Sequence, residues 1–90
     1  MNSNGKPRIK PEMVLRQESD DWALLYDPNT GTAYGLHPVS VFICRLLDGR
    51  HTVESISGQV SRQFYDVPDD SESDIRDFIT DLVNNGLASY

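Results

Sequence analysis

The sequence predicts one small α+β domain in which a three-stranded antiparallel sheet is followed by a bundle of three helices, in the order βββααα. Up to residue 36, short runs of strand-forming residues alternate with polar turns. From residue 38 onward, apolar residues recur instead at the spacing of helices. Ninety residues allow one domain. Three short strands cannot bury both faces of a sheet, so the helices are needed as cover.

The first ten residues are polar and contain Gly5 and Pro7, with Pro11 close behind. This composition predicts a flexible N-terminal arm over residues 1–10, and the folded domain is expected to occupy residues 11–90. The start of the chain also lacks the apolar stretch of a signal peptide.

Two predicted strands precede the clearest turn of the chain. Residues 13–18 alternate between apolar and polar side chains, which is typical of a strand with one solvated face. Residues 22–26 are apolar on both faces, which predicts the central strand. The turn spans residues 27–31, where Asp27 suits the first position and Gly31 can adopt the left-handed conformation.

The third predicted strand, residues 32–36, has one face that is almost bare. Ala33 and Gly35 share this face, so another backbone or a helix could approach it closely. The opposite face carries larger side chains: Thr32, Tyr34 and Leu36.

The first predicted helix covers residues 38–48. Pro38 stands at its first position and Gly49 just past its end, the places that favour these two residues. His37 is interpreted as the cap of this helix. Its wide apolar stripe consists of Val39, Phe42, Ile43, Leu46 and Leu47.

The second predicted helix covers residues 53–64, with Thr52 as its N-cap. The third begins near Asp70 and ends at Asn85-Gly86. Its apolar stripe repeats the spacing of the first helix: Ile75, Phe78, Ile79, Leu82 and Val83.

Two smaller features complete the third helix. Ser71 and Asp74 are predicted to form a capping pair at its start. Residues 87–90 are predicted to be a short tail that can pack against the domain. The whole arrangement resembles a winged helix whose sheet has been placed first.

The net charge of −6, from 14 acidic and 8 basic side chains, excludes some classes of partner. It disfavours sequence-independent binding to nucleic acid, which depends on basic residues. No run of apolar residues is long enough to span a membrane. The single cysteine cannot form an internal disulfide, which indicates a reducing compartment and hence the cytoplasm.

Residues that could catalyse a reaction or bind a metal are scattered. His37 and His51 lie 14 positions apart, at opposite ends of the first helix, which disfavours a shared metal. Cys44 lies in mid-helix without an activating base and is interpreted as a small hydrophobe. The acidic residues from Asp66 to Asp74 do not fit a calcium loop, because Ile75 stands where that loop needs glycine. The sequence therefore predicts neither an enzyme nor a bound cofactor or metal.

Three helices could also form a helix-turn-helix that binds DNA. The third helix would then be the recognition helix, and its polar positions include Asp74, Asp77 and Asp81 beside the single base Arg76. Carboxylates would repel the DNA phosphates. A winged-helix DNA-binding regulator is therefore the alternative rather than the main hypothesis.

Residues 31–87 resemble the PqqD family, which is named for pyrroloquinoline quinone biosynthesis. The most specific part is the segment Asp48-Gly49-x-x-Thr52-Val53-x-x-Ile56. Four further matching segments are Tyr34-Gly35-Leu36, Phe42-Ile43, Asp74-Ile75-Arg76-Asp77-Phe78-Ile79 and Asn85-Gly86-Leu87. The first two strands match in pattern only, and His37 stands where the family often has Asn, Asp or Ser.

This resemblance implies a RiPP recognition element, a non-catalytic domain that serves ribosomally synthesised and post-translationally modified peptides. Such domains bind the leader of a precursor peptide and present the peptide to a modifying enzyme. The enzymes of the family include radical SAM enzymes of the SPASM type, lasso-peptide proteases and cyclodehydratases. In the family, the leader adds as a strand beside the third strand, in a groove walled by the third helix.

The resemblance implies that the peptide site lies on the third strand and the third helix. Which flank of the helix faces the leader stays open, because its apolar residues could all be core, with Asp74 or Arg76 making the contacts instead. A dimer formed through the same strand edge is a third hypothesis. The expected peptide-binding residues are Thr32, Ala33, Tyr34, Gly35, Leu36, Asp74, Ile75, Arg76, Phe78, Ile79 and Leu82.

Overall fold

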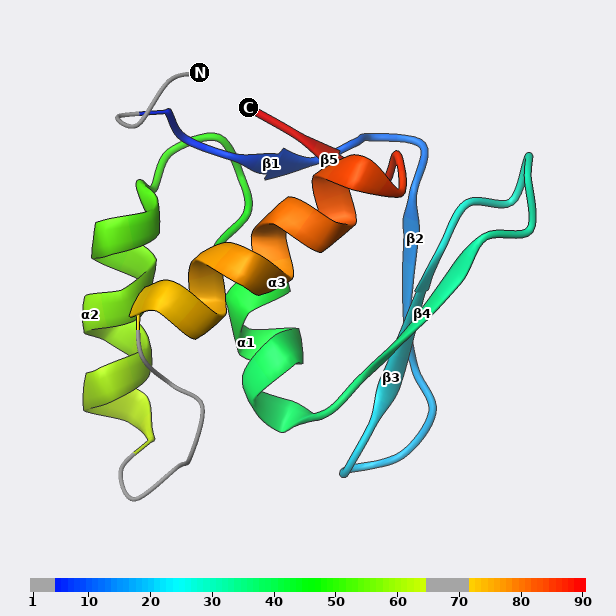
Figure 1. Ribbon diagram of the computed structural model, residues 1–90. Helices are drawn as coiled ribbons and strands as arrows, with labels where there is room; N and C mark the ends of the chain where they lie inside the picture. Colours follow the sequence, from blue (N-terminus) through cyan, green and yellow to red (C-terminus); the bar gives the residue numbers. More distant parts are fainter. Residues whose placement is uncertain (1–4, 65–71) are drawn as a thin grey trace.

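The computed structural model describes residues 5–64 and 72–90 (Figure 1). The predicted three strands and three helices are all present, so the α+β prediction is confirmed, and two further short strands lie near the chain ends. In chain order the elements are β1 (Arg8–Ile9), β2 (Val14–Gln17), β3 (Ala23–Tyr26), β4 (Ala33–Leu36), α1 (Pro38–Arg45), α2 (Val53–Gln63), α3 (Glu72–Asn84) and β5 (Ala88–Ser89).

The three predicted strands form one antiparallel sheet in the order β2-β3-β4, which confirms that the second predicted strand is central. The turn between β3 and β4 also forms as predicted. Gly31 has a φ of 80° there, and its N–H donates to the Asp27 carbonyl oxygen at 2.8 Å. This tight turn aligns Tyr26 with Ala33 and Ala23 with Leu36.

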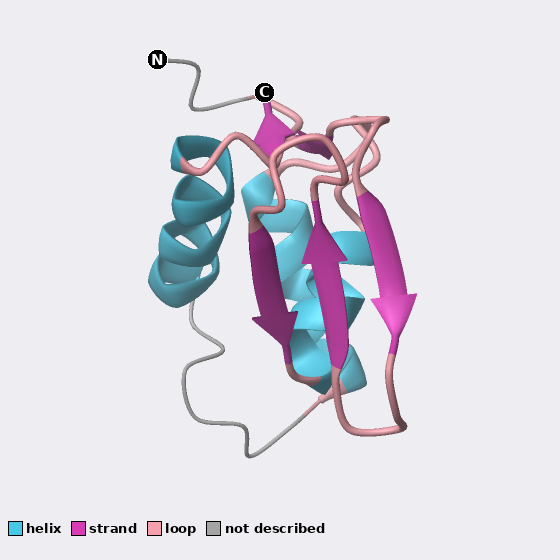
Figure 2. Ribbon diagram, turned by 90° about the vertical axis from the view of Figure 1, so that its right-hand side faces the viewer, coloured by secondary structure: helices cyan, strands magenta, loops and turns pink. Residues whose placement is uncertain are grey.

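The helices cover one face of this sheet, and the strands lie in front of them in Figure 2. Ala23, Leu25 and Leu36 point toward the helices and are at most 2% exposed. Ala33 and Gly35 are exposed on the opposite face. The alternation predicted for residues 32–36 therefore holds, and it leaves Ala33 and Gly35 outside the core.

Helix α1 begins at Pro38, as predicted, but it ends at Arg45 rather than near residue 48. The last turn tightens there, because the Leu46 N–H donates to the Ile43 carbonyl oxygen at 2.9 Å and the Leu47 N–H to that of Cys44 at 3.1 Å. The N-terminal segment pairs with the backbone that follows. The Ile9 N–H donates to the Leu47 carbonyl oxygen at 2.9 Å, and the Gly49 N–H donates to that of Pro7 at 3.2 Å.

The ends of the other two helices agree with the prediction where the structure describes them. The Thr52 side chain accepts a hydrogen bond from the Ser55 N–H at 3.1 Å, which is the predicted N-cap of α2. At the end of α3, Gly86 has a φ of 77°. The predicted start of the third helix near Asp70 and its capping residue Ser71 lie outside the described residues.

The N-terminal segment differs from the predicted flexible arm over residues 7–9. Strand β1 pairs with β5 in an antiparallel ribbon, with Arg8 opposite Ser89 and Ile9 opposite Ala88. Pro7 is among the fully buried side chains. The predicted C-terminal tail is therefore a strand, and both ends of the described chain lie at the same end of the molecule (Figure 1). Within the described ranges, the helices are all too short or too polar to cross a membrane.

Candidate peptide-binding site

Strand β4 is an edge strand. Its residues alternate between those whose backbone groups bond to β3 and those whose backbone groups face the open edge of the sheet. The Asp27 N–H donates to the Thr32 carbonyl oxygen at 2.9 Å. Hydrogen-bonded and non-hydrogen-bonded pairs alternate along an antiparallel ladder, so Tyr34 and Leu36 direct their N–H and C=O groups at β3. Ala33 and Gly35 must direct theirs at the open edge of the sheet.

The pairing on the other side of β3 supports this alternation. The Glu18 N–H donates to the Trp22 carbonyl oxygen at 3.1 Å, so alternate residues from Trp22 onward bond toward β2. The remaining residues of β3, Ala23 and Leu25, are then those that bond toward β4. Their partners are Leu36 and Tyr34, which agrees with the alternation derived from Asp27.

Helix α3 stands beside the β4 edge and meets it through side chains (Figures 1 and 2). The rings of Tyr34 and Phe78 are perpendicular, with centroids 6.1 Å apart and an interplanar angle of 84°. Burial raises the pKa of the Tyr34 hydroxyl, and the Asp81 carboxylate raises that pKa further through its charge and a hydrogen bond.

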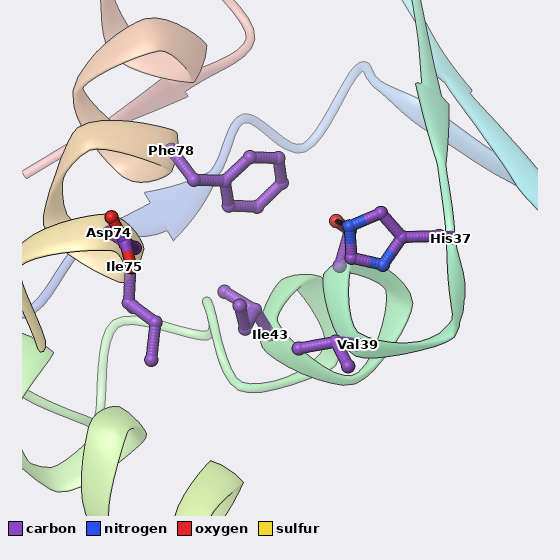
Figure 3. Close-up of a pocket in the computed structure, with 7 residues that line it drawn as sticks. His37, Val39, Ile43, Asp74, Ile75 and Phe78 are labelled. Atoms are coloured by element: carbon purple, nitrogen blue, oxygen red, sulfur yellow. Dashed lines mark hydrogen bonds between the residues drawn. The ribbon is translucent and has the colours of Figure 1, made fainter. Parts of the chain in front are cut away.

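A pocket continues this contact zone beyond the end of β4 (Figure 3). It has a volume of about 180 Å³ and opens between α1, α3 and the residue that follows β4. In Figure 3, Phe78 and Asp74 approach from α3, whereas His37 approaches from the opposite side. The pocket combines apolar walls with a few polar groups, as ligand sites commonly do. Its lining residues are His37, Val39, Ser40, Ile43, Asp74, Ile75 and Phe78.

Together these contacts identify the side of α3 that faces β4. Asp74 lines the pocket, Phe78 contacts Tyr34, and Asp81 interacts with the Tyr34 hydroxyl. These residues lie at positions i, i+4 and i+7 and thus on one side of the helix. We call Asp74, Phe78 and Asp81 the α3 flank, and the zone where it meets β4 the β4–α3 seam.

His37 has a different role from the predicted cap. It occupies the N-cap position of α1 with extended backbone (φ −87°, ψ 174°), but its side chain makes no capping hydrogen bond. Its Nε2 atom lies 3.2 Å from the Ser40 Oγ atom instead. The imidazole therefore contacts a side chain of the first turn rather than a backbone N–H, and it forms part of the pocket wall.

The expected site residues on β4 divide by their backbone and side-chain roles. Ala33 and Gly35 offer edge backbone groups, while the half-buried Tyr34 reaches α3. Leu36 is 2% exposed and belongs to the core. Thr32 lies just before the strand, where its Oγ1 atom is 3.0 Å from that of Thr30.

The expected residues on α3 divide in the same way. Ile75 is 1% exposed and lines the pocket from the core side. Ile79 and Leu82 are fully buried and belong to the core. Arg76 points elsewhere, because its guanidinium pairs with Glu72 at 2.7 Å, one turn away on the exposed side of the helix.

Sequence reasoning missed several residues of this zone. Asp81 could have been found from its spacing, since it follows Phe78 by three positions and Asp74 by seven. The pocket residues of α1 carried no such signal, because their membership depends on how α1 packs against α3. The missed residues are His37, Val39, Ser40, Ile43 and Asp81.

The other candidate groups lie apart from the seam. Cys44 is buried, and burial raises the pKa of its thiol to about 12. His51 Nδ1 lies 2.9 Å from an Asp48 carboxylate oxygen in the loop after α1. Among the described residues, no three side chains of the metal-ligating kinds lie close enough together to hold an ion.

Comparisons with known proteins agree with this geometry. A family model described as "Coenzyme PQQ synthesis protein D (PqqD)" matches residues 23–88. The solved structure described as "Lasso peptide synthetase B1 complexed with the leader peptide" is 28% identical, with a TM-score of 0.72, and the match covers 94% of this chain and 99% of that one. A second, "TbiB1 in Complex with the TbiA(beta) Leader Peptide", is 29% identical, with a TM-score of 0.73 and coverages of 91% and 94%. A comparison with curated proteins found no match.

Proposed function

The chain belongs to the PqqD family, and from this premise we propose that it is a RiPP recognition element. It binds the leader of a ribosomally made precursor peptide and presents that precursor to a modifying enzyme. The observation that carries this proposal is the open edge of β4, which lies beside the α3 flank and the pocket. Two similar structures were solved as complexes with leader peptides.

The proposed binding mode is strand addition to β4. The N–H and C=O groups of Ala33 and Gly35 point to the open edge and can pair with an extended peptide. Four backbone hydrogen bonds would contribute about 4 kcal/mol net, whereas a micromolar complex requires about 8 kcal/mol. Backbone pairing alone is therefore insufficient, and at least one leader side chain must find an apolar environment.

The pocket and the seam supply that environment. The pocket lies in line with the end of β4, and Ile43, Ile75 and Phe78 offer it apolar surface. We propose that a Leu, Ile or Phe of the leader occupies it. Of the residues expected from the sequence, Ile79 and Leu82 then support this surface from beneath, while Tyr34 and Phe78 touch the peptide directly.

The opposite edge of the sheet, β2, is a weaker candidate for strand addition. All four of its residues are exposed, and in Figure 2 a helix stands beside one edge strand of the sheet but not beside the other. A peptide on β2 would thus gain backbone hydrogen bonds without a neighbouring wall. This difference favours β4.

We propose further that the domain is non-catalytic and acts in the cytoplasm. Its buried thiol supports the first point, because a neutral thiol is a poor nucleophile. The modifying enzyme belongs to one of the classes that work with such domains, a radical SAM enzyme of the SPASM type, a lasso-peptide protease or a cyclodehydratase. A DNA-binding role is disfavoured, since the α3 flank carries carboxylates.

The test uses the precursor peptides encoded by the open reading frames beside the gene. A fluorescently labelled precursor should bind the full chain with micromolar affinity or better, and the same precursor without its leader should not. Modification of the precursor by the neighbouring enzyme should require the chain. Binding that is unaffected by removing the leader, or steep salt-dependent binding to DNA instead, would refute the proposal.

A further inference from the structure

We infer that the leader segment that pairs with β4 carries basic side chains at two positions that face α3, separated by an apolar residue that faces Phe78. The pattern is basic-x-apolar-x-basic. This inference rests on the proposed function and specifies which leaders the site can take. It follows from the order of side chains along the β4–α3 seam.

The seam has a defined order, because β4 and α3 run alongside one another in opposite chain directions (Figure 1). His37, just past the end of β4, shares the pocket with Asp74 near the start of α3. One turn further along α3, Phe78 meets Tyr34. Asp81 meets the hydroxyl of the same tyrosine. A strand on the open edge of β4 therefore passes a carboxylate, an aromatic ring and a second carboxylate.

The spacing of these groups suits alternate residues of a strand. Asp74 and Asp81 are seven positions apart, or about 10.5 Å along a helix. In an added strand, alternate residues face the same side as Tyr34 and Leu36, and positions i and i+4 are about 13 Å apart. The long side chains of Lys and Arg can make up the difference. Position i+2 then lies beside the ring of Phe78.

The charges of this region favour a basic occupant. The chain carries a net charge of −6. The nearest base of the helix, Arg76, is paired with Glu72 on another side of α3. Asp81 follows Phe78, whose ring meets that of Tyr34, by three positions and so lies on the same side of α3. Its charge also acts on the hydroxyl of Tyr34.

The test selects peptides with the protein itself. A phage-displayed library of random peptides of about twelve residues, enough for one strand and its flanks, is panned on the immobilised full chain at low salt. Parallel selections use the double variant Asp74→Asn/Asp81→Asn. The control is Glu54→Gln, which removes one charge from an exposed position of another helix, α2.

The expected result is enrichment of the basic-x-apolar-x-basic pattern on the native chain and on the control, but not on the double variant. A selected peptide should bind the double variant about tenfold more weakly than the native chain at low salt, and this difference should shrink as salt screens the charges. Neutral or acidic residues at the two outer positions would overturn the inference. Equal selection by the double variant would do the same.

The two proposals fail in different ways. In one outcome, selected peptides change the NMR signals of the Ala33 and Gly35 backbone amides yet lack the basic pattern. That result would support strand addition to β4 and contradict the charge inference alone. Peptides that bind without touching those amides, or a selection that yields no binder, would contradict strand addition to β4 and the charge inference together. Circular dichroism of each variant confirms that it is folded.

Discussion

Ala33 and Gly35 supply the backbone groups on which the proposed strand addition depends, although alanine has a small side chain and glycine has none. The sequence indicated that these two residues share a face, because strand side chains alternate. It could not indicate that their backbone groups point to the open edge, since that depends on which pairs of the ladder are hydrogen-bonded. The bond from Asp27 to Thr32 supplies this information.

Replacing Ala33 by proline tests whether the Ala33 N–H faces the open edge and binds the leader. Ala33→Pro removes an edge N–H without removing a hydrogen bond to β3, and should weaken leader binding by about tenfold or more while the fold persists. Ala33→Ser keeps the N–H and should bind as the native chain does. Isothermal titration with the precursor peptide measures both variants, and equal affinities would show that this N–H is not used.

Cys44 gives a second residue-scale prediction, concerning stability rather than binding. Burial raises the pKa of its thiol to about 12 from an ordinary value of 9.0. Above pH 9 the unfolded chain loses this proton while the folded chain keeps it, so folding becomes less favourable. Below pH 9 both states are protonated and the effect vanishes.

Urea unfolding at a series of pH values detects this linkage. Between about pH 9 and 12, the free energy of unfolding of the native chain should fall by about 1.4 kcal/mol per pH unit more steeply than that of Cys44→Ala. The variant is the control for all other groups that titrate in this range. Parallel curves would mean that the thiol ionises as easily in the folded chain as in the unfolded one.

At the scale of single elements, the sequence predicted the first residues of α1 and α2, but it predicted the capping side chain correctly only for α2. Thr52 caps α2 as expected from its residue type. His37 stands at the corresponding position of α1, yet its ring turns toward Ser40 and the pocket. A sequence pattern identifies the residue at a helix start, but the direction of its side chain depends on what packs nearby.

A pair of substitutions separates these two helix starts. Thr52→Ala should lower the free energy of unfolding by about 1 kcal/mol, because it removes a capping hydrogen bond. His37→Asn should raise it by up to about 1 kcal/mol, because asparagine can supply a cap that the histidine does not. Thermal unfolding followed by circular dichroism measures both, and a loss of stability in His37→Asn would assign the ring a structural role.

The ribbon formed by β1 and β5 was missed because two-residue strands have no periodic pattern to detect. Their pairing joins chain ends that are far apart in sequence, and the proline and glycine content of the first ten residues pointed to an arm instead. Pro7 and Ile9 nevertheless pack against the domain. The same segment pairs with the backbone just beyond α1, where the Ile9 N–H donates to the Leu47 carbonyl oxygen.

Two neighbouring substitutions test the ribbon. Ile9→Ala should lower the free energy of unfolding by about 1–2 kcal/mol, because it removes a side chain that packs partly against the core. Arg8→Ala, at an exposed position of the same strand, should change it by less than about 0.5 kcal/mol. Urea unfolding provides both values, and equal effects would indicate that the segment is not packed in solution.

For the whole molecule, composition and periodicity were sufficient to predict the layers. The central strand, the turn before β4 and the three helices followed from residue types and spacing. The α3 flank did not, because Ile75, Phe78, Ile79 and Leu82 form a stripe too wide to show which side meets the sheet and which meets the core. Only the packing of α3 against Tyr34 distinguishes Phe78 from its buried neighbours.

The central claim is that the leader adds to the β4 edge, and amide hydrogen exchange tests it most directly. Exchange is recorded residue by residue with and without a saturating amount of the precursor peptide. The account predicts that exchange at the amides of Ala33 and Gly35 slows by about tenfold or more, while that at β2 is unchanged. Slower exchange in Val14–Gln17, with none at Ala33 and Gly35, would contradict it.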